Sequence, residues 1–191
     1  MKLILASTSP FRKEILNKLG IDFTSMSPEV DEAALANETP QQLVERLSIA
    51  KAKAVADKVE SALVIGSDQV SVIDGEIIGK PHTHENAVKQ LQNASGKTVT
   101  FYTGLCLYNS TTNQYQSEVV PFNVVFRILS DEQIESYLRK ETPYNCAGSF
   151  KSEALGIVLF EKLKGEDPNT LMGLPLIRLV KMLEKENFPI L

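Results

Sequence analysis

The sequence predicts an α/β fold with some α+β character, in which helices flank a mixed, twisted sheet. Short apolar runs alternate with segments of helical period along most of the chain, as in layered folds of helices and strands. Two long segments with strand-like alternation, 98–108 and 114–128, follow each other directly. Consecutive long strands pair in antiparallel fashion, so the sheet is expected to be mixed rather than purely parallel.

In the first half of the chain, residues 2–6 (Lys-Leu-Ile-Leu-Ala) are expected to form a buried strand. A helix then begins with Ser9 as N-cap and Pro10 in the first turn, and Gly20 marks its end. A second helix begins at Thr39-Pro40-Gln41-Gln42, which is a capping-box pattern. Both helices therefore have start signals that depend on local sequence alone.

In the second half, residues 62–66 form a buried strand that extends through Val72 and turns back at Asp74-Gly75. A helix is expected at 83–94, and a second capping box at 130–133 opens another helix that runs to residue 139. A strand at 156–163 and a closing helix at 174–185 complete the pattern. In the segment 114–128, one face is expected to be apolar; its members are Phe122, Val124, Phe126 and Ile128.

Composition excludes several classes of protein. A length of 191 residues suits one domain, or two lobes that share a core. The net charge of −4 argues against a nucleic-acid partner, which needs a broad basic surface. No segment reads as a secretion signal or a membrane span, and two cysteines are too few for a disulfide framework. We therefore expect a cytoplasmic protein without a membrane partner.

The turn from the first strand into the first helix has the chemistry of an anion site. A helix N-terminus presents free N–H groups and partial positive charge, and here it is accompanied by Ser7, Ser9 and Arg12. The glycines and the Gly-Lys-Ser/Thr ending of a P-loop are missing. The alternative is an ordinary capped helix with a surface arginine.

Two charged residues break the local pattern in positions that favour a site. Lys51 falls on the apolar stripe of the second helix, so it must either extend to solvent or find an anionic partner. Asp68 follows the apolar run 62–66, and ligands of α/β proteins gather at strand ends. Its alternative is an aspartate that opens a turn.

Lys80 and Glu153 lie in glycine-containing segments where the backbone can approach a ligand, although both could be solvated loop residues. Together with Asp31, Glu32 and Asp68, the basic groups suit a polyphosphate bridged to the protein by a metal ion. The chain has neither a histidine cluster for zinc nor a Ser-His-Asp constellation.

The same segments resemble the Maf family in order and spacing. The matching motifs are Leu5-Ala6-Ser7-Thr8-Ser9-Pro10 with Arg12, Asp31-Glu32, Lys51-Ala52, Gly66-Ser67-Asp68, Gly79-Lys80-Pro81, Ala147-Gly148-Ser149, Asp167-Pro168-Asn169-Thr170 and Gly173-Leu174-Pro175. The resemblance implies a single Maf-like domain over residues 1–191, with a fold like that of inosine triphosphatase and two lobes around a deep cleft. It also implies a hydrolase that cleaves nucleoside triphosphates to monophosphate and diphosphate, and a possible homodimer.

Residue by residue, the resemblance implies that Asp68 is the catalytic proton acceptor for the attacking water. Ser7, Arg12, Lys51 and Lys80 would bind the triphosphate, and Glu32 and Asp68 would hold a divalent cation, Mg²⁺ or Mn²⁺. An ordinary aspartate, with a pKa near ~3.9, is a weak base for water, so the metal would carry part of the activation. Whether Asp68 acts mainly as base or as metal ligand stays open at this point.

Three positions, Phe11, Gln69 and Glu153, resemble those of the YceF-type subfamily, which is associated with 7-methyl-GTP. A carboxylate at 153 could accept the two adjacent donors of guanine, and an aromatic face at 11 could attract a base made cationic by N7 methylation. Phe11 could equally join the core stripe with Ile15, and phenylalanine stands where tryptophan is expected for this subfamily. The resemblance thus implies hydrolysis of 7-methyl-GTP to 7-methyl-GMP, which removes a modified nucleotide from the pool. The alternatives are hydrolysis of GTP, UTP or dTTP, and a nucleotide-binding regulator of cell division.

Overall fold

The computed structural model describes residues 1–191, and the chain divides into two compact units. Unit 1 comprises Met1–Gln69, Tyr102–Val120 and Asp167–Leu191, and unit 2 comprises Val70–Phe101 and Pro121–Glu166. Three strands contribute residues to both units, namely β3 (Ala62–Ile73), β5 (Thr98–Asn109) and β6 (Gln114–Phe126).

The strands form a mixed sheet in the order β2-β1-β3-β5-β6-β7, and β4 pairs with β3. The first strand, β1 (Lys2–Ala6), runs parallel to both β2 (Thr24–Met26) and β3. The pairs of β3 with β4 (Glu76–Ile78) and of β6 with β7 (Phe160–Lys164) are antiparallel. The helices are α1 (Pro10–Asn17), α2 (Pro40–Ala56), α3 (His84–Ala94), α4 (Asp131–Glu141) and α5 (Leu176–Lys185). The expected α/β class and mixed sheet are confirmed.

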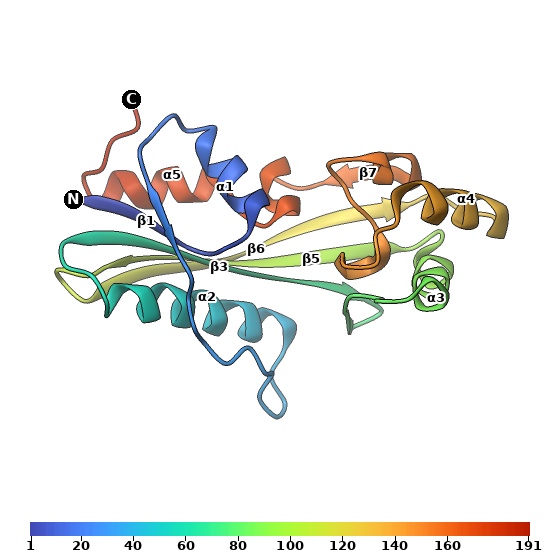
Figure 1. Cartoon of the computed structure of the whole chain (residues 1–191), viewed down its shortest axis with the longest axis horizontal. Coiled ribbons are helices and arrows are strands. Elements are labelled where there is room, and N and C mark those ends of the chain that lie inside the picture. Colours follow the sequence, from blue (N-terminus) through green and yellow to red (C-terminus); the bar gives the residue numbers. More distant parts are fainter. The chain divides into compact units, whose positions relative to one another are not determined.

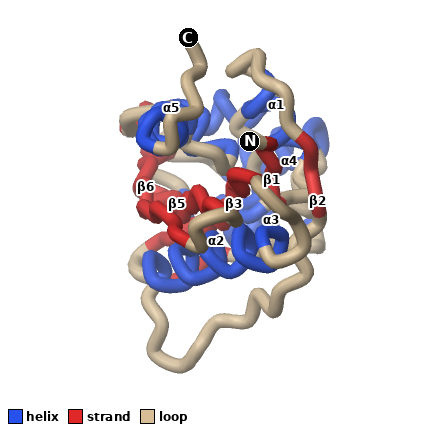
Figure 2. The backbone as a smooth tube through the Cα atoms, turned by 90° about the vertical axis from the view of Figure 1, so that its left-hand side faces the viewer, coloured by secondary structure: helices blue, strands red, loops and turns tan.

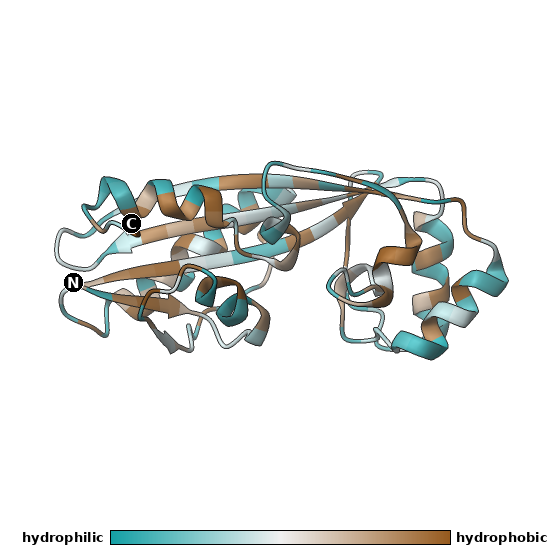
Figure 3. Ribbon diagram, turned by 90° about the horizontal axis from the view of Figure 1, so that it is seen from above, coloured by the Kyte–Doolittle hydropathy of each residue, from teal (hydrophilic) through white to brown (hydrophobic).

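Unit 1 is a three-layer arrangement in which α1 and α5 lie on one face of the strands and α2 lies on the other (Figures 1 and 2). Because side chains alternate along a strand, Leu3 and Leu5 of β1 join the core beneath α1 and α5, whereas Ile4 and Ala6 join the core above α2. β3 and β5 alternate in the same way. Strands buried on both faces explain the continuous apolar runs of the sequence, which Figure 3 shows along β1.

Two glycines allow α2 to lie unusually close to the strands. A Cβ atom at Gly66 of β3 would stand 2.1 Å from the carbonyl oxygen of Ser48, and one at Gly104 of β5 would stand 2.0 Å from that of Val44. Any side chain at either position would force the helix backbone away from the sheet. This close approach sets the height of α2 above the strands.

Unit 2 has an aromatic core. The ring of Phe150 packs edge-to-face against Phe101, Phe126 and Phe160, with centroids 5.2–5.6 Å apart. Such edge-to-face pairs each add about 0.5–1.5 kcal/mol beyond the burial of their area. The segment that carries Gly148 and Phe150 is thereby fixed within this unit.

The helix starts are formed by the predicted capping residues. Ser9 accepts a hydrogen bond from the backbone of Arg12, and Pro10 is the first residue of α1. Thr39 and Ser130 each form a complete capping box, with Gln42 and Gln133 respectively. These starts depend on residues within one turn, which is why the sequence predicted them correctly.

Three local predictions were wrong or incomplete. Ile128, expected on the apolar face of β6, is 87% exposed, because the pairing shifts register between Val125 and Phe126 and the strand ends there. The strand expected at 156–163 begins only at Phe160, since Leu155–Leu159 forms a 3-10 helix in which Gly156 donates to the carbonyl of Lys151. The three-residue β2 was missed, because it is too short to show an alternating pattern.

None of the helices combines the length and the apolar composition that a bilayer crossing requires.

The close approach of α2 gives a stability prediction. Gly66→Ala should lower the free energy of unfolding by at least about 2 kcal/mol, because the new methyl group meets helix backbone at Ser48 and Ala52 that no rotamer change relieves. Urea denaturation measures this change. Gly79→Ala is the matched control, since its Cβ meets no atom within 4 Å. Equal stability of the two variants would contradict the packing described here.

Candidate active site

The carboxyl end of β1 opens directly into the turn that starts α1. Ser7 follows the strand and is buried, and its hydroxyl oxygen accepts a hydrogen bond from the backbone N–H of Ser9 at 3.1 Å. The turn therefore points backbone N–H groups and the first turn of α1 toward the strand end. This arrangement suits an anion, as the sequence predicted.

Arg12 is oriented by a turn from the other end of the chain. Its Nε donates to the carbonyl oxygen of Gly173 at 2.9 Å, and the hydroxyl of Ser67 donates to the same oxygen at 2.8 Å. Gly173 has a φ of 97°, which a residue with a side chain adopts only under strain. Burial lowers the pKa of Arg12, and the charges of Asp68 and Glu32 oppose that shift.

The side chain of Lys51 forms two ion pairs and does not extend to solvent. Its Nζ lies 2.6 Å from Oδ1 of Asp68 and 2.8 Å from Oε1 of Glu32, and its side chain is only 7% exposed. Of the two alternatives left by the sequence, the anionic partner is the one that the structure shows. Gly66 makes these contacts possible, because it brings Ser48 and Ala52, on either side of Lys51, down onto β3.

Asp68 lies within β3 and not at its end. The last registered pair of β1 and β3 joins Leu5 to Ile65, so β3 continues after its parallel neighbour has stopped. Asp68 therefore stands just beyond the carboxyl end of β1, next to the turn at Ser7. The strand that ends beside Asp68 is therefore β1 and not its own strand β3.

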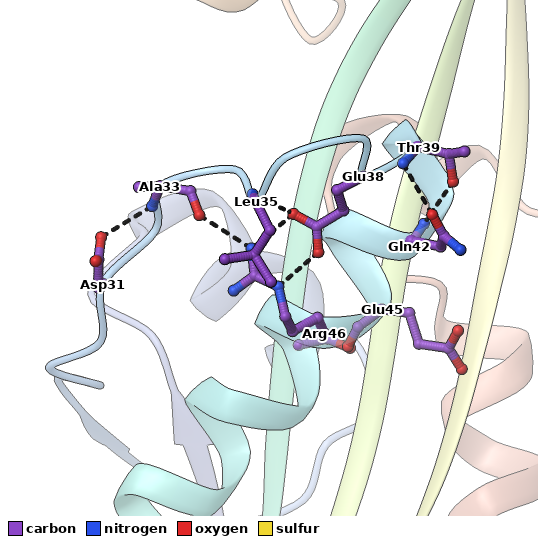
Figure 4. Close-up of polar contacts among 9 residues, drawn as sticks. Asp31, Ala33, Leu35, Glu38, Thr39, Gln42, Glu45 and Arg46 are labelled. Carbon is purple, nitrogen blue, oxygen red and sulfur yellow. Dashed lines mark hydrogen bonds and ion pairs between the residues drawn. The ribbon is translucent and has the colours of Figure 1, made fainter.

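Glu32 belongs to a loop that an ion pair fastens to α2 (Figure 4). Arg46 grips the carboxylate of Glu38 with two hydrogen bonds of 2.5 and 2.8 Å and also donates to the carbonyl oxygen of Ala33 at 3.0 Å. Glu38 accepts in addition from the backbone N–H of Leu35 at 2.9 Å. The segment from Ala33 to Glu38, directly after Glu32, is thus held on the helix that carries Lys51.

These groups surround a cavity of about 290 Å³ in unit 1. It is lined by Ala6, Ser7, Thr8, Ser9, Arg12, Ser27, Pro28, Glu32 and Lys51. Asp68 reaches this group through Lys51. Two cationic and two anionic side chains therefore meet at an anion-binding helix start, which is an arrangement suited to a phosphate chain and its counter-ion.

The residues present fit a divalent cation of the magnesium type. The chain has no cluster of three or more acidic, histidine or cysteine side chains that could hold an ion alone. However, Asp68 and Glu32 present carboxylate oxygens that converge on one point, the Nζ of Lys51. Mg²⁺ usually takes one or two protein carboxylates and completes its shell with water and substrate phosphates.

Two further predicted residues lie in unit 2. Lys80 and Glu153 are both exposed, and the only polar contact of Glu153 is a 3.3 Å hydrogen bond from the hydroxyl of Ser152. Within this unit, Gly148 donates to the carbonyl oxygen of Gly79, so the Gly79-Lys80 and Gly148-Ser149 segments lie side by side. Gln90 bridges the same two segments through Gly79 and Ser149.

Phe11 and Gln69, both in unit 1, have different surroundings. The Phe11 ring is 44% exposed, so it does not join the core stripe with Ile15, which is fully buried. The amide nitrogen of Gln69 donates to Thr103 at 2.8 Å and to the carbonyl oxygen of Thr170 at 2.7 Å. With both protons engaged, Gln69 has only its carbonyl oxygen left for a base.

The residues that orient the site could not be recognised from the sequence. Asp167 is almost fully buried and accepts from the backbone N–H groups of Asn169 and Ile177, which shapes the turn that ends at Gly173. The Glu38–Arg46 pair was missed as well. The one available signal was the Asp167-Pro168-Asn169-Thr170 motif, to which the sequence alone assigns no role.

Comparison with known proteins places these features in a family. Residues 2–186 match the family model described as "Maf-like protein". The chain is 58% identical over 189 residues to the "7-methyl-GTP pyrophosphatase" of Colwellia psychrerythraea (strain 34H), which covers 99% of this chain and 94% of that protein.

Among solved structures, the chain is similar to the Ham1 protein of Staphylococcus aureus, with a TM-score of 0.46 and 14% identity over 66% of this chain and 72% of that one. A HAM1 protein from Coxiella burnetii gives a TM-score of 0.46 and 12% identity, over 80% of this chain and 88% of that one.

The Glu38–Arg46 pair should make stability depend on acid pH. Hydrogen bonds from Arg46 lower the pKa of Glu38 from 4.5 to about 2, so its contribution to stability is complete above pH 4.5 and is lost as the pH falls toward 2. Glu38→Gln should therefore be less stable than the wild type at pH 7, and the difference should disappear between pH 4.5 and 2. Urea denaturation across this range measures it. A difference that is the same at every pH would contradict this assignment, and Asp57→Asn, which breaks the exposed pair with Lys53, is the control.

Proposed function

This chain belongs to the family of Maf-like proteins, and from that premise we propose that it is a nucleoside triphosphate pyrophosphatase acting on 7-methyl-GTP. The products are 7-methyl-GMP and diphosphate, and the reaction removes a modified nucleotide from the pool. The name of the relative at 58% identity supports this substrate.

One observation of the structure supports the proposal most strongly. The buried pair of Lys51 and Asp68 lies beside the start of α1, with Arg12 oriented on the same group of charges. A site that bound phosphates without a metal would gain nothing from a buried carboxylate next to its cations, because that carboxylate repels the ligand. A carboxylate in this place suits a site that holds a divalent cation and accepts a proton from an attacking water.

The reaction is a displacement at the α-phosphorus. Water attacks that atom, the bond to the oxygen bridging the α- and β-phosphorus atoms breaks, and diphosphate leaves with the bond electrons. Asp68 accepts the proton of the attacking water. Ser7, Arg12 and Lys51 of unit 1 bind the phosphate oxygens, and we assign the same role to Lys80 of unit 2.

Glu32 and Asp68 would hold the divalent cation, Mg²⁺ or Mn²⁺. When bound, such an ion neutralises phosphate charge and lowers the pKa of a coordinated water. The side chains of the protein have two further roles: they hold the phosphate chain in place, and Asp68 takes up the proton. The role of Asp68 as proton acceptor and its role as ligand are compatible, since a carboxylate has two oxygens.

Base recognition is assigned to three residues. Glu153 accepts the two adjacent N–H donors of guanine, which a neutral acceptor binds less strongly. The exposed ring of Phe11 offers an aromatic face to the cationic methylated base, worth about 0.5–2 kcal/mol. Gln69 contributes its carbonyl oxygen, because its amide nitrogen is occupied by Thr103 and Thr170.

We place the enzyme in the cytoplasm, where nucleotides are made and used, as a protein without nucleic-acid or membrane partners and with a homodimer as a possible assembly. The net charge of −4 supports the absence of a nucleic-acid partner.

The proposed substrate is tested by steady-state kinetics on 7-methyl-GTP, GTP, UTP and dTTP with Mg²⁺ or Mn²⁺. The rate of diphosphate release is the measured quantity. The methylated nucleotide should have the highest kcat/KM, because only it combines the guanine edge with a positive charge on the ring. If GTP is hydrolysed as efficiently, methyl selectivity is rejected, and if UTP or dTTP leads, guanine recognition is rejected.

Asp68→Asn is the matched control for turnover. It keeps the size of the side chain and removes the proton acceptor, so diphosphate release should fall by at least about a thousandfold, whereas nucleotide binding measured without the cation should be retained. Calorimetry measures the binding. A wild type that binds 7-methyl-GTP but releases no diphosphate would favour a nucleotide-binding regulator instead.

A further inference from the structure

The ammonium group of Lys51 occupies the point on which the carboxylates of Asp68 and Glu32 converge. The 2.6 Å contact with Asp68 is a direct, charge-assisted hydrogen bond, and the 2.8 Å contact with Glu32 is an ion pair. The two carboxylates are the residues to which the proposed function assigns the divalent cation. The ammonium group of Lys51 therefore occupies the position in which a divalent ion would contact the carboxylate oxygens of Asp68 and Glu32.

Burying the ammonium group of Lys51 costs desolvation free energy, which interactions with its partners must offset. Lys51 is 6% exposed and has lost nearly all of its water, so its charge depends on these two partners. A divalent ion that took the two carboxylates would leave the ammonium buried and unpaired. Phosphate oxygens are suitable replacement partners, and the proposed function assigns Lys51 to them.

We propose that Lys51 competes with the divalent cation for Asp68 and Glu32, so that the free protein binds the cation weakly and the triphosphate admits it by drawing Lys51 away. The inference rests on the proposed function for the identity of the two ligands. It adds an order of events, in which the nucleotide and the cation bind together, and it explains why a lysine is buried between two acids.

The competition is tested by titrating the protein with Mn²⁺ alone, without nucleotide. Electron paramagnetic resonance measures the concentration of the free ion and so gives the Kd. Lys51→Met removes the ammonium and keeps an unbranched apolar side chain, so the two carboxylates are left to the metal. Its Kd for Mn²⁺ should be at least about tenfold lower than that of the wild type. If Lys51→Met binds Mn²⁺ no more tightly than the wild type, the competition is rejected.

Lys53→Met is the matched control. Lys53 lies two residues further along α2, is 53% exposed and pairs only with Asp57, so its loss removes the same charge without freeing the site. Its affinity for Mn²⁺ should stay at the wild-type value. An equal gain in both variants would show a general effect of net charge and would overturn the proposal.

Two further variants protect the test. Lys51→Gln keeps hydrogen-bond donors for the two acids and serves if the methionine variant does not fold; it should show the same gain. The double variant Lys51→Met, Asp68→Asn should lose the gain, because one ligand is gone. A gain that survives in the double variant would place the ion elsewhere and contradict the proposal.

The coupling between nucleotide and metal gives a second readout. A GTP analogue with a methylene group between the α- and β-phosphorus atoms should raise the affinity of the wild type for Mn²⁺ more than it raises that of Lys51→Met, because only the wild type has a lysine to displace. Equal coupling in both would overturn the order of events. Failure of the proposed function appears separately, as absence of diphosphate release, since none of these binding measurements requires turnover.

Discussion

The approach of α2 to the strands of unit 1 is the constraint on which the candidate site depends. Gly66 and Gly104 leave no room for a side chain, so the helix backbone rests on β3 and β5. At this height Lys51 reaches Asp68 at 2.6 Å. A helix raised by the width of a methyl group would lose this contact, which is destabilising because two buried charges would no longer compensate each other.

Around this contact, segments that are far apart in the sequence divide the work. The turn at Ser7 and the start of α1 supply the anion-binding dipole, and the turn at Gly173 orients Arg12. The loop of Glu32 is fastened to α2 through Arg46, one and a half turns before Lys51. Each charged group is thus held by the backbone or by a second ion pair, so the site is organised before a ligand arrives, which reduces the cost of binding.

Local features could be predicted from the sequence, whereas tertiary ones could not. The caps at Ser9, Thr39 and Ser130 involve residues within a single turn, and their side-chain chemistry determines them. The exposed Ile128 and the 3-10 helix at 155–159 depend on where a neighbouring strand stops pairing, which no periodicity encodes. β2 is stabilised by pairing with β1 and has too little sequence to show it.

The same division holds for the site. The sequence showed that Lys51 and Asp68 are charged residues at positions where apolar ones are expected. Only the fold shows that they form an ion pair with each other. The sequence did not reveal that Gln69 is already bonded to Thr103, because these residues lie on different strands whose packing must be known first. Nor did it reveal the pair of Glu38 and Arg46, because the loop before α2 has no periodic pattern from which its path over the helix could be predicted. Residues that violate a local pattern were therefore the signal from which the site could be predicted. The residues that hold them in position could not be recognised from the sequence.

The most direct measurement of the central claim is a crystal structure of the protein with a non-hydrolysable analogue of 7-methyl-GTP. The phosphate chain is expected to lie at the start of α1 in contact with Arg12 and Lys51, with the carboxylate of Asp68 facing the α-phosphorus. A phosphate chain bound away from α1, with Asp68 remote from it, would contradict the account.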